Sequence, residues 1–497
     1  MNIKKYNSLV LFVLGFGVFV FTRMSKLVPT IPVAILIAPI FILRFIRTQP
    51  ARRGIPLTLL GFIVSINIGL WGLFDIGGGL SSLVFNVLRS AVLALHYFLP
   101  YMIDRWIYPH YKKYGVASAF TFPIITTAVL FLSSLEGPFE GTIQIGKFVY
   151  GPLAGQQLLS LVGIPGYIFL SSWCASLINY LWEHDFDWRK GTKTVIAFLL
   201  IVVAIFVFGT VKLSSRNPEQ ETVKTAAIVL IPEDGKLVHP ENFWKDKSVP
   251  PFEETMARIE LLTHTAASHG AKIVSFSEFA ILLHEKDVER VRAEYQRMAR
   301  KQNVYLSANY AYYGTEGKGE NKHLLIDHQG TILLDYAKRY LYGMGDTGET
   351  GIYRKGPEVI QSVETPYGKI AVSLCRDLEM VDYMRQAGKA NVDIMLSPAN
   401  QVTKDLVVHS NYMRTIEYGF SLVRPAFNGI SVAVDYHGRI LNQMDSDETD
   451  DGIMYAEIPT RGINTLYTTI GDIFGWICVV GLLGLLVLSL HSWKNQQ

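Results

Sequence analysis

The sequence predicts an α-helical transmembrane bundle of about eight spans joined to one α/β domain outside the cytoplasm. Hydrophobic residues make up 49% of the 497 residues and charged residues only 18%, a composition typical of membrane proteins. The apolar residues are also unevenly distributed, which predicts three segments. Residues 1–213 form a seven-span bundle, residues 214–465 a soluble-type domain, and residues 466–497 a last span with a short cytoplasmic tail.

The predicted spans are the apolar runs, because a helix needs about 20 such residues to cross the hydrocarbon. The runs cover 8–22, 31–46, 56–74, 80–100, 116–135, 157–181, 194–212 and 470–490. The first two are short. No small-residue cleavage site follows the first run, so we interpret it as a span and not as a signal peptide.

The basic residues predict how the bundle is oriented. One set of loops and tails holds most of them: Lys4, Lys5, Arg44, Arg47, Arg52, Arg53, Arg105, Lys112, Lys113, Arg189, Lys190, Lys193 and Lys494. The short loops on the other side hold only Arg23, Lys26 and Lys147. Because cytoplasmic loops are enriched in Lys and Arg, we expect both termini in the cytoplasm. Seven spans then place the domain at 214–465 outside.

Charge and cysteine content exclude several classes of function. A net charge of +3, spread over short clusters, argues against a nucleic-acid partner. Cys174 and Cys478 fall within apolar runs, so no disulfide framework is predicted and Cys375 is the single cysteine of the polar domain. The sequence has neither zinc-type His/Cys spacing nor a phosphate-binding Gly-rich loop. We therefore predict no metal and no diffusible cofactor.

Alternating strand and helix patterns predict the α/β domain. The predicted strands are 224–232, 271–278, 303–310, 323–330, 369–375, 392–398 and 429–438. Helices are predicted over 251–269 and 285–302, and in the second of these apolar residues recur at spacings of three and four. Gly-centred turns within 323–336 and 431–444 predict two hairpins.

Three chemically active residues follow predicted strands. They are Glu278, Lys338 and Cys375. A lone cysteine there is more often a small buried apolar residue than a nucleophile. Strand ends in α/β domains gather at one edge of the sheet, however, so we expect a carboxylate, an ammonium and a thiol to meet. Glu278 would take the thiol proton, while Lys338 would lower the thiol pKa and stabilise an oxyanion together with the backbone N–H after Cys375.

The order Glu278, Lys338, Cys375 resembles the Glu–Lys–Cys triad of the carbon–nitrogen hydrolase (nitrilase) superfamily. The segment 417–441 resembles that superfamily's arginine-bearing helix, N-G-x-S strand and final hairpin. Together with the apolar regions on either side, the layout is similar to the apolipoprotein N-acyltransferase family. The resemblance implies an α-β-β-α sandwich for the polar domain.

The resemblance also implies a reaction and its partners. Cys375 would attack an ester of a membrane phospholipid and form a thioester, with Glu278 as general base and Lys338 as oxyanion stabiliser. The amine of a diacylglyceryl-cysteine at a lipoprotein N-terminus would then accept the acyl group. The expected location is the bacterial inner membrane.

Several positions depart from the family pattern. The usual C-Y-E after the nucleophile appears as Cys375, Arg376 and Asp377, so Asp377 is the candidate for that glutamate's role. The loop after Lys338 lacks the family's Pro-Phe pair, and Asp346 or Glu349 is the candidate for its glutamate.

The same loop, 339–353, contains Tyr340 and Tyr342 among several glycines. It has two interpretations. It is a mobile lid that touches lipid or substrate, or it is an ordered surface loop whose aromatic side chains pack beneath it.

Other functions fit parts of the sequence. A membrane-tethered amidase would use the same triad with water as acceptor, although seven spans are more than a tether needs. An acyltransferase with a different amine acceptor would also use it. A receptor or transporter with a non-catalytic outer domain would not need the triad. Asp75 and Asp104 lie near span ends, where interfacial solvation explains them better than transport does.

Overall fold

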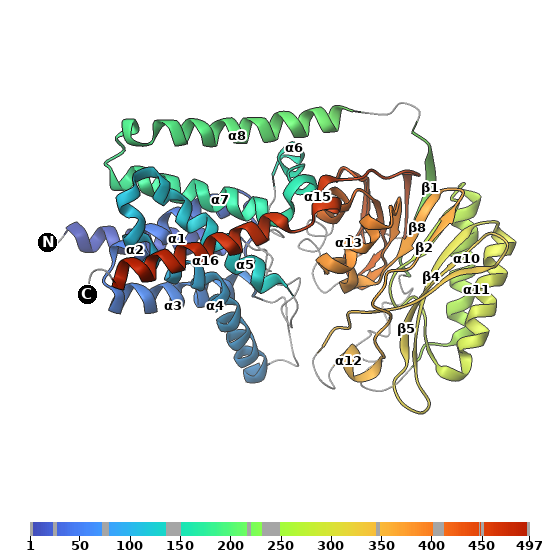
Figure 1. Cartoon of the computed structure of the whole chain (residues 1–497). Coiled ribbons are helices and arrows are strands. Elements are labelled where there is room, and N and C mark those ends of the chain that lie inside the picture. Colours follow the sequence, from blue (N-terminus) through green and yellow to red (C-terminus); the bar gives the residue numbers. More distant parts are fainter. Residues whose placement is uncertain are drawn as a thin grey trace. The chain divides into compact units, whose positions relative to one another are not determined.

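The computed structural model describes residues 3–22, 27–71, 79–135, 151–215, 220–230, 249–343, 348–400, 412–446, 448 and 452–494. The chain divides into two compact units. The first combines Met1–Ser215 with Ile470–Gln497, and the second is Arg216–Thr469. Figure 1 shows the first as a group of helices and the second as sheets with helices against them.

Helices form at every predicted span of the first unit. They are α1 (Ile3–Val20), α2 (Ala34–Thr48), α3 (Ala51–Gly69), α4 (Gly79–Tyr111), the 3₁₀ helix η1 (Lys112–Phe120), α5 (Thr121–Ser134), α6 (Leu153–Gln156), α7 (Leu159–Glu183), α8 (Trp188–Ser214) and α16 (Ile473–Lys494).

Within the described residues, five helical stretches are long and apolar enough to cross a membrane. They are Ala51–Gly69, Asn86–Ser134, Leu159–Glu183, Trp188–Ser214 and Ile473–His491. The second of these joins α4, η1 and α5 into one 49-residue stretch, which the sequence divides into two spans. The apolar part of α1, Ser8–Val20, is shorter than a span, and α2 has 15 residues. The total of eight spans therefore stays a prediction.

The long helices expose apolar side chains outward. On α8, Leu200 and Val211 are each 62% exposed, and on α16 Val480 is 68% exposed. Exposing such a continuous apolar surface to water would cost free energy, whereas lipid tails solvate it without penalty. The first unit is therefore built for a lipid environment.

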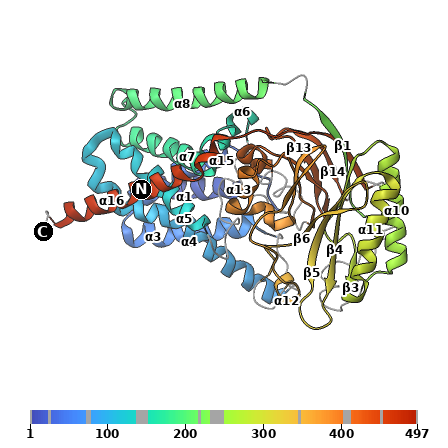
Figure 2. The same ribbon diagram turned by 45° about the vertical axis from the view of Figure 1, so that its right-hand side comes forward.

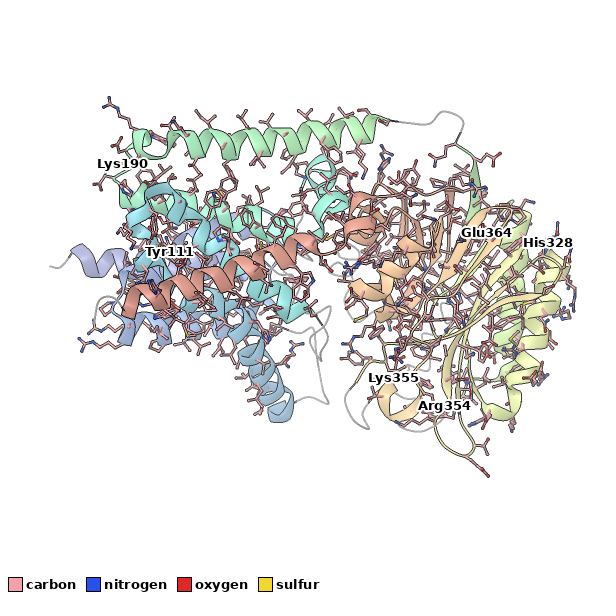
Figure 3. All side chains as sticks on the ribbon, in the orientation of Figure 1. Tyr111, Lys190, His328, Arg354, Lys355 and Glu364 are labelled. Carbon is pink, nitrogen blue, oxygen red and sulfur yellow. The ribbon has the colours of Figure 1, made fainter. Side chains whose placement is uncertain are left out.

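Inside the first unit, polar contacts join helices that are distant in sequence. Asp104 on α4 is fully buried and accepts hydrogen bonds from Nε and Nη2 of Arg47 on α2, at 2.8 and 2.9 Å. The expectation that interfacial solvation explains Asp104 is therefore wrong, because packing places an arginine against it. Asp75 lies outside the described residues. The hydroxyl of Tyr111, labelled in Figure 3, donates to the carbonyl of Leu485 and so ties α4 to α16.

The second unit contains two main sheets. Its helices and strands are β1 (Thr222–Ile228), α10 (Phe252–Ser268), β2 (Ile273–Phe276), β3 (Leu282–His284), η3 (Glu285–Asp287), α11 (Val288–Gln302), β4 (Tyr305–Tyr313), β5 (Glu320–Ile326), β6 (Ile332–Ala337), α12 (Glu349–Ile352), β7 (Ser362–Thr365), β8 (Gly368–Val372), η4 (Cys375–Glu379), α13 (Val381–Lys389), β9 (Ile394–Leu396), β10 (Ala399–Asn400), β11 (Ser421–Arg424), β12 (Ala426–Phe427), β13 (Ile430–Val434), β14 (Ile440–Asp445) and β15 (Ile453–Pro459), followed by α15 (Leu466–Ile470).

One sheet has the order β15-β1-β2-β4-β5-β6, with β3 also paired to β4, and the other has the order β14-β13-β11-β9-β8-β7. Every predicted strand is present, and both predicted hairpins form as the antiparallel pairs β5–β6 and β13–β14. The predicted helices appear as α10 and α11.

The two sheets form the inner layers of a sandwich. Ile259 of α10 and Tyr295 of α11 pack with Phe276 and Leu306 in one buried cluster against the first sheet. Figure 2 shows α10 and α11 on one side of the sheets and α13 on the other. The α-β-β-α arrangement implied by the family resemblance is therefore present.

The segment 417–441 differs from its prediction in one respect. Its first arginine, Arg424, lies on strand β11 and not on a helix. The preceding helix covers residues 412–418 and carries Arg414. Gly419, with a φ of +76°, ends that helix, because a left-handed residue after the last turn suits glycine best.

Candidate active site

The three predicted residues lie just past the ends of strands in the second unit. Glu278 comes two residues after β2, Lys338 directly follows β6, and Cys375 begins η4 three residues after β8. Cys375 has a φ of +47°, and Phe279, next to Glu278, has a φ of +60°. Non-glycine residues rarely adopt this left-handed conformation, which concentrates at functional turns.

Lys338 is the centre of a buried charge cluster. Its side chain is only 2% exposed, and its Nζ donates to Oε1 of Glu278 at 2.8 Å. The same Nζ lies 2.9 and 2.7 Å from the two carboxylate oxygens of Glu349. Burial alone would lower the pKa of Lys338, but the two carboxylates raise it well above its ordinary value. The ammonium is therefore charged at any physiological pH.

An asparagine completes the cluster. Nδ2 of Asn321, on β5, donates to Oε1 of Glu278 at 2.9 Å and to Oε1 of Glu349 at 3.1 Å. Asn309 on β4 in turn donates to Oδ1 of Asn321 at 3.0 Å. The backbone N–H of Asn400 donates to the other oxygen of Glu278 at 2.9 Å. Both oxygens of Glu278 are thus fixed in position.

Asn400 also connects this cluster to the thiol. Sγ of Cys375 lies 3.6 Å from the carbonyl oxygen of Asn400, whose N–H binds Glu278. Cys375 interacts electrostatically with Glu278 and Lys338. Burial and the Glu278 charge raise the pKa of Cys375 to about 12, against the lowering effect of Lys338. Lys338 therefore acts on the thiol pKa in the expected direction, but desolvation of the buried thiol outweighs it.

Asp377 accepts hydrogen bonds that stabilise the turn carrying Cys375. Its Oδ2 accepts from the N–H of Leu374 at 3.0 Å and from the hydroxyl of Tyr336 at 2.5 Å. Its Oδ1 accepts from the N–H of Tyr340 at 2.7 Å. Burial raises the pKa of Asp377 to about 6 although these donors lower it. This carboxylate thus joins the turn before Cys375 to the loop after Lys338.

Three further candidates from the sequence belong to the loop after Lys338 or contact it. Nη1 of Arg376 donates to the carbonyl of Leu341 at 3.2 Å. The ring of Tyr340 meets that of Tyr383 edge to face, and Tyr342 is 47% exposed while its N–H donates to Glu349. The first part of the loop is thus tied to the site. Asp346 lies outside the described residues.

Sequence reasoning missed four groups near the triad. They are Asn309, Asn321, Asn400 and Arg424. Asparagine is depleted in strands, so Asn309 within the predicted strand 303–310 was a usable signal. Asn321 precedes the predicted strand 323–330 and gave no such signal. Arg424 and Asn400 carried no comparable signal. Among the described residues, no group of three or more His, Cys, Asp or Glu side chains is placed to hold a metal ion.

The sequence profile of the carbon–nitrogen hydrolase family matches residues 247–466. The chain is 24% identical over 442 residues to an apolipoprotein N-acyltransferase of Haemophilus influenzae, covering 83% of this chain and 81% of that one. A Synechocystis apolipoprotein N-acyltransferase is 29% identical over 385 residues, covering 71% and 68%.

Two further similarities cover smaller shares of the chain. The nitrilase and fragile histidine triad fusion protein NitFhit of Caenorhabditis elegans is 25% identical over 194 residues, which are 35% of this chain and 43% of that relative. A solved amidase from Nesterenkonia sp. is 18% identical with a TM-score of 0.42, covering 52% of this chain and 95% of the amidase. The two acyltransferase alignments are longer than the second unit and therefore extend into the helical unit. Residues 247–466 thus match the carbon–nitrogen hydrolase family, and most of the chain is similar to proteins named apolipoprotein N-acyltransferase.

Proposed function

We propose that this protein transfers an acyl group from a membrane phospholipid to the N-terminal amine of a diacylglyceryl-cysteine lipoprotein. The observation that carries the proposal is the buried Glu278–Lys338–Glu349 cluster beside the Cys375 turn. Similarity to proteins named apolipoprotein N-acyltransferase supports the choice of substrates. The apolar helices support a membrane location.

In the first half-reaction, Cys375 Sγ attacks the carbonyl carbon of a phospholipid ester. Because the pKa of Cys375 is raised, the resting thiol is protonated, and Glu278 takes its proton as the S–C bond forms. The Lys338 ammonium stabilises the negative charge that develops on the carbonyl oxygen. The C–O bond then breaks, Glu278 returns the proton to the leaving alkoxide, and a lysophospholipid departs from the thioester.

In the second half-reaction, the acceptor amine attacks the thioester carbon. Glu278 takes a proton from the nitrogen as the N–C bond forms. The C–S bond breaks and the proton returns to Cys375 Sγ, which restores the resting thiol. A neutral amine attacks a thioester much better than water does, and a lipid-lined site would limit hydrolysis by excluding water.

The other candidates receive supporting roles. Glu349 balances the Lys338 charge and holds Tyr342 through its backbone N–H. Asp377 positions the Cys375 turn. Tyr340, Tyr342 and Arg376 shape the side of the site formed by the loop after Lys338. We place the protein in the bacterial inner membrane with both termini cytoplasmic and residues 214–465 outside.

The test is to trap the acyl-enzyme. The purified full chain is incubated in mixed micelles with a diacylphospholipid carrying radiolabelled acyl chains. We expect hydroxylamine-sensitive label on Cys375, and its transfer to a synthetic diacylglyceryl-cysteine peptide. Cys375→Ala abolishes labelling, whereas Cys174→Ala, a matched control in the helical unit, leaves it unchanged.

The outcomes distinguish the alternatives. Release of labelled fatty acid without transfer to the peptide would favour a hydrolase. Transfer to another amine but not to this peptide would favour a different acceptor. Full activity of the Cys375→Ala variant would end the enzyme proposal and leave a binding function for the second unit.

A further inference from the structure

Arg424 is a buried arginine directly beneath the Cys375 turn. It is only 1% exposed, and its Nη1 donates to the carbonyl of Cys375 at 3.4 Å. The same nitrogen donates to the carbonyl and the hydroxyl of Ser397 at 3.2 and 3.1 Å. Its Nε has no hydrogen-bond partner among the described residues. Every acceptor that the described part of the chain offers Arg424 is therefore neutral.

The other deeply buried arginines are neutralised by carboxylates. Arg47 pairs with Asp104, and Arg414, on the helix that precedes β11, pairs with Glu417. Of the described residues, none forms an ion pair with Arg424. Burying a cation without a carboxylate partner costs free energy. We therefore expect such a group only where its positive charge stabilises another group.

The field of Arg424 acts on the nucleophile. Its electrostatic interactions are, in order of size, with Cys375, Glu379 and Glu278. Its hydrogen bond reaches the Cys375 carbonyl, while the carbonyl of Pro398 accepts from the Cys375 N–H at 2.8 Å. Hydrogen bonds to its N–H and its carbonyl thus fix the left-handed backbone of Cys375. The donor to the carbonyl, Arg424, carries a positive charge.

We propose that Arg424 is a positioning residue that clamps the strained Cys375 turn and supplies to its sulfur a positive charge that is not engaged in an ion pair. The inference rests on the proposed role of Cys375 as nucleophile. The charge stabilises the sulfur whenever it carries negative charge, during proton loss to Glu278 and again when it leaves the tetrahedral intermediate. Lys338 then remains available for the carbonyl oxygen.

The test measures thiol ionisation without any acyl donor. Alkylation of Cys375 by iodoacetamide is followed by mass spectrometry in the detergent-purified full chain between pH 7 and 9, where the rate is proportional to the thiolate fraction. We expect Arg424→Met and Arg424→Gln to lower the alkylation rate about tenfold at every pH, equivalent to one unit of pKa. Arg424→Lys keeps the charge and should stay within about threefold of wild type.

Two comparisons make the result decisive. Arg439→Met removes an arginine that pairs with Asp435 in the turn between β13 and β14, and should leave the alkylation rate unchanged. A folded Arg424→Gln or Arg424→Met variant that alkylates at the wild-type rate would overturn the inference. Equal slowing in Arg424→Lys and Arg424→Gln would also overturn it, since charge would then play no part. Slowing as expected in a protein that forms no thioester from phospholipid would leave the inference standing and refute the proposed function.

Discussion

Asn321 offers the sharpest test of how the buried charge cluster works. Its side-chain amide is shared by two carboxylates, with 2.9 Å to Glu278 and 3.1 Å to Glu349. Asn321→Leu keeps a similar shape and removes both donors. A hydrogen bond to a buried charged group contributes about 1.5–3 kcal/mol, so the two together amount to roughly 3–6 kcal/mol. Lys338 and backbone N–H groups still bind both carboxylates, so we expect the lower end of that range.

The part of this loss that falls on Glu278 should appear in the reaction rate. If about 1.5–3 kcal/mol of orienting energy is lost in the transition state, acylation of Cys375 slows roughly 10- to 150-fold. Single-turnover labelling from phospholipid measures this rate, and thermal unfolding in detergent measures the stability loss. Asn321→Asp should be worse than Asn321→Leu, because it places a third carboxylate beside Lys338.

Asn442→Leu is the matched control, since Asn442 is an exposed β14 residue whose Nδ2 donates to the carbonyl of Tyr455. Its acylation rate should equal that of wild type. An Asn321→Leu variant with a wild-type acylation rate and a wild-type unfolding temperature would refute the reasoning, because the shared amide would then contribute nothing.

Three further outcomes follow from the same geometry. Lys338→Met should slow thioester formation by about 100-fold or more through loss of an oxyanion donor, and a smaller effect than tenfold would assign that role elsewhere. Tyr336→Phe removes a 2.5 Å hydrogen bond to buried Asp377 and should lower the free energy of unfolding by about 2 kcal/mol, whereas Tyr312→Phe, at the partly exposed Glu320, should cost less than about 1 kcal/mol. Burial lowers the pKa of His323 to about 4. Because the pKa of His323 is lower in the folded state, the unfolded state binds the proton first as the pH falls below the unfolded pKa of about 6.5. The free energy of unfolding therefore decreases by up to about 3 kcal/mol between pH 6.5 and 4. The acid-induced drop in unfolding temperature should therefore flatten in His323→Asn, and an unchanged pH profile would contradict this explanation.

Local patterns in the sequence located the apolar helices, two helices of the second unit and the seven predicted strands, but they did not predict strands such as β7, β11 and β15. Helical periodicity and apolar length located α3, α7, α8 and α16, because a chain in lipid must satisfy its backbone hydrogen bonds within each helix. Alternating strands and Gly-centred turns located the hairpins β5–β6 and β13–β14. Because strand ends collect at sheet edges, the same patterns indicated that Glu278 and Lys338 would meet, and they lie 2.8 Å apart.

Only the tertiary structure decided which groups surround those residues and how they titrate. The contact between Asn321 and both glutamates, the Arg424 bond to the Cys375 carbonyl and the burial of Asp104 against Arg47 each join residues far apart in the chain. Periodicities of 2 and 3.6 residues report which face of an element is apolar, but they carry no information about which other element packs against it. The pKa of Cys375 depends on that packing, because the balance between desolvation and the charges of Glu278 and Lys338 exists only once the fold encloses the thiol.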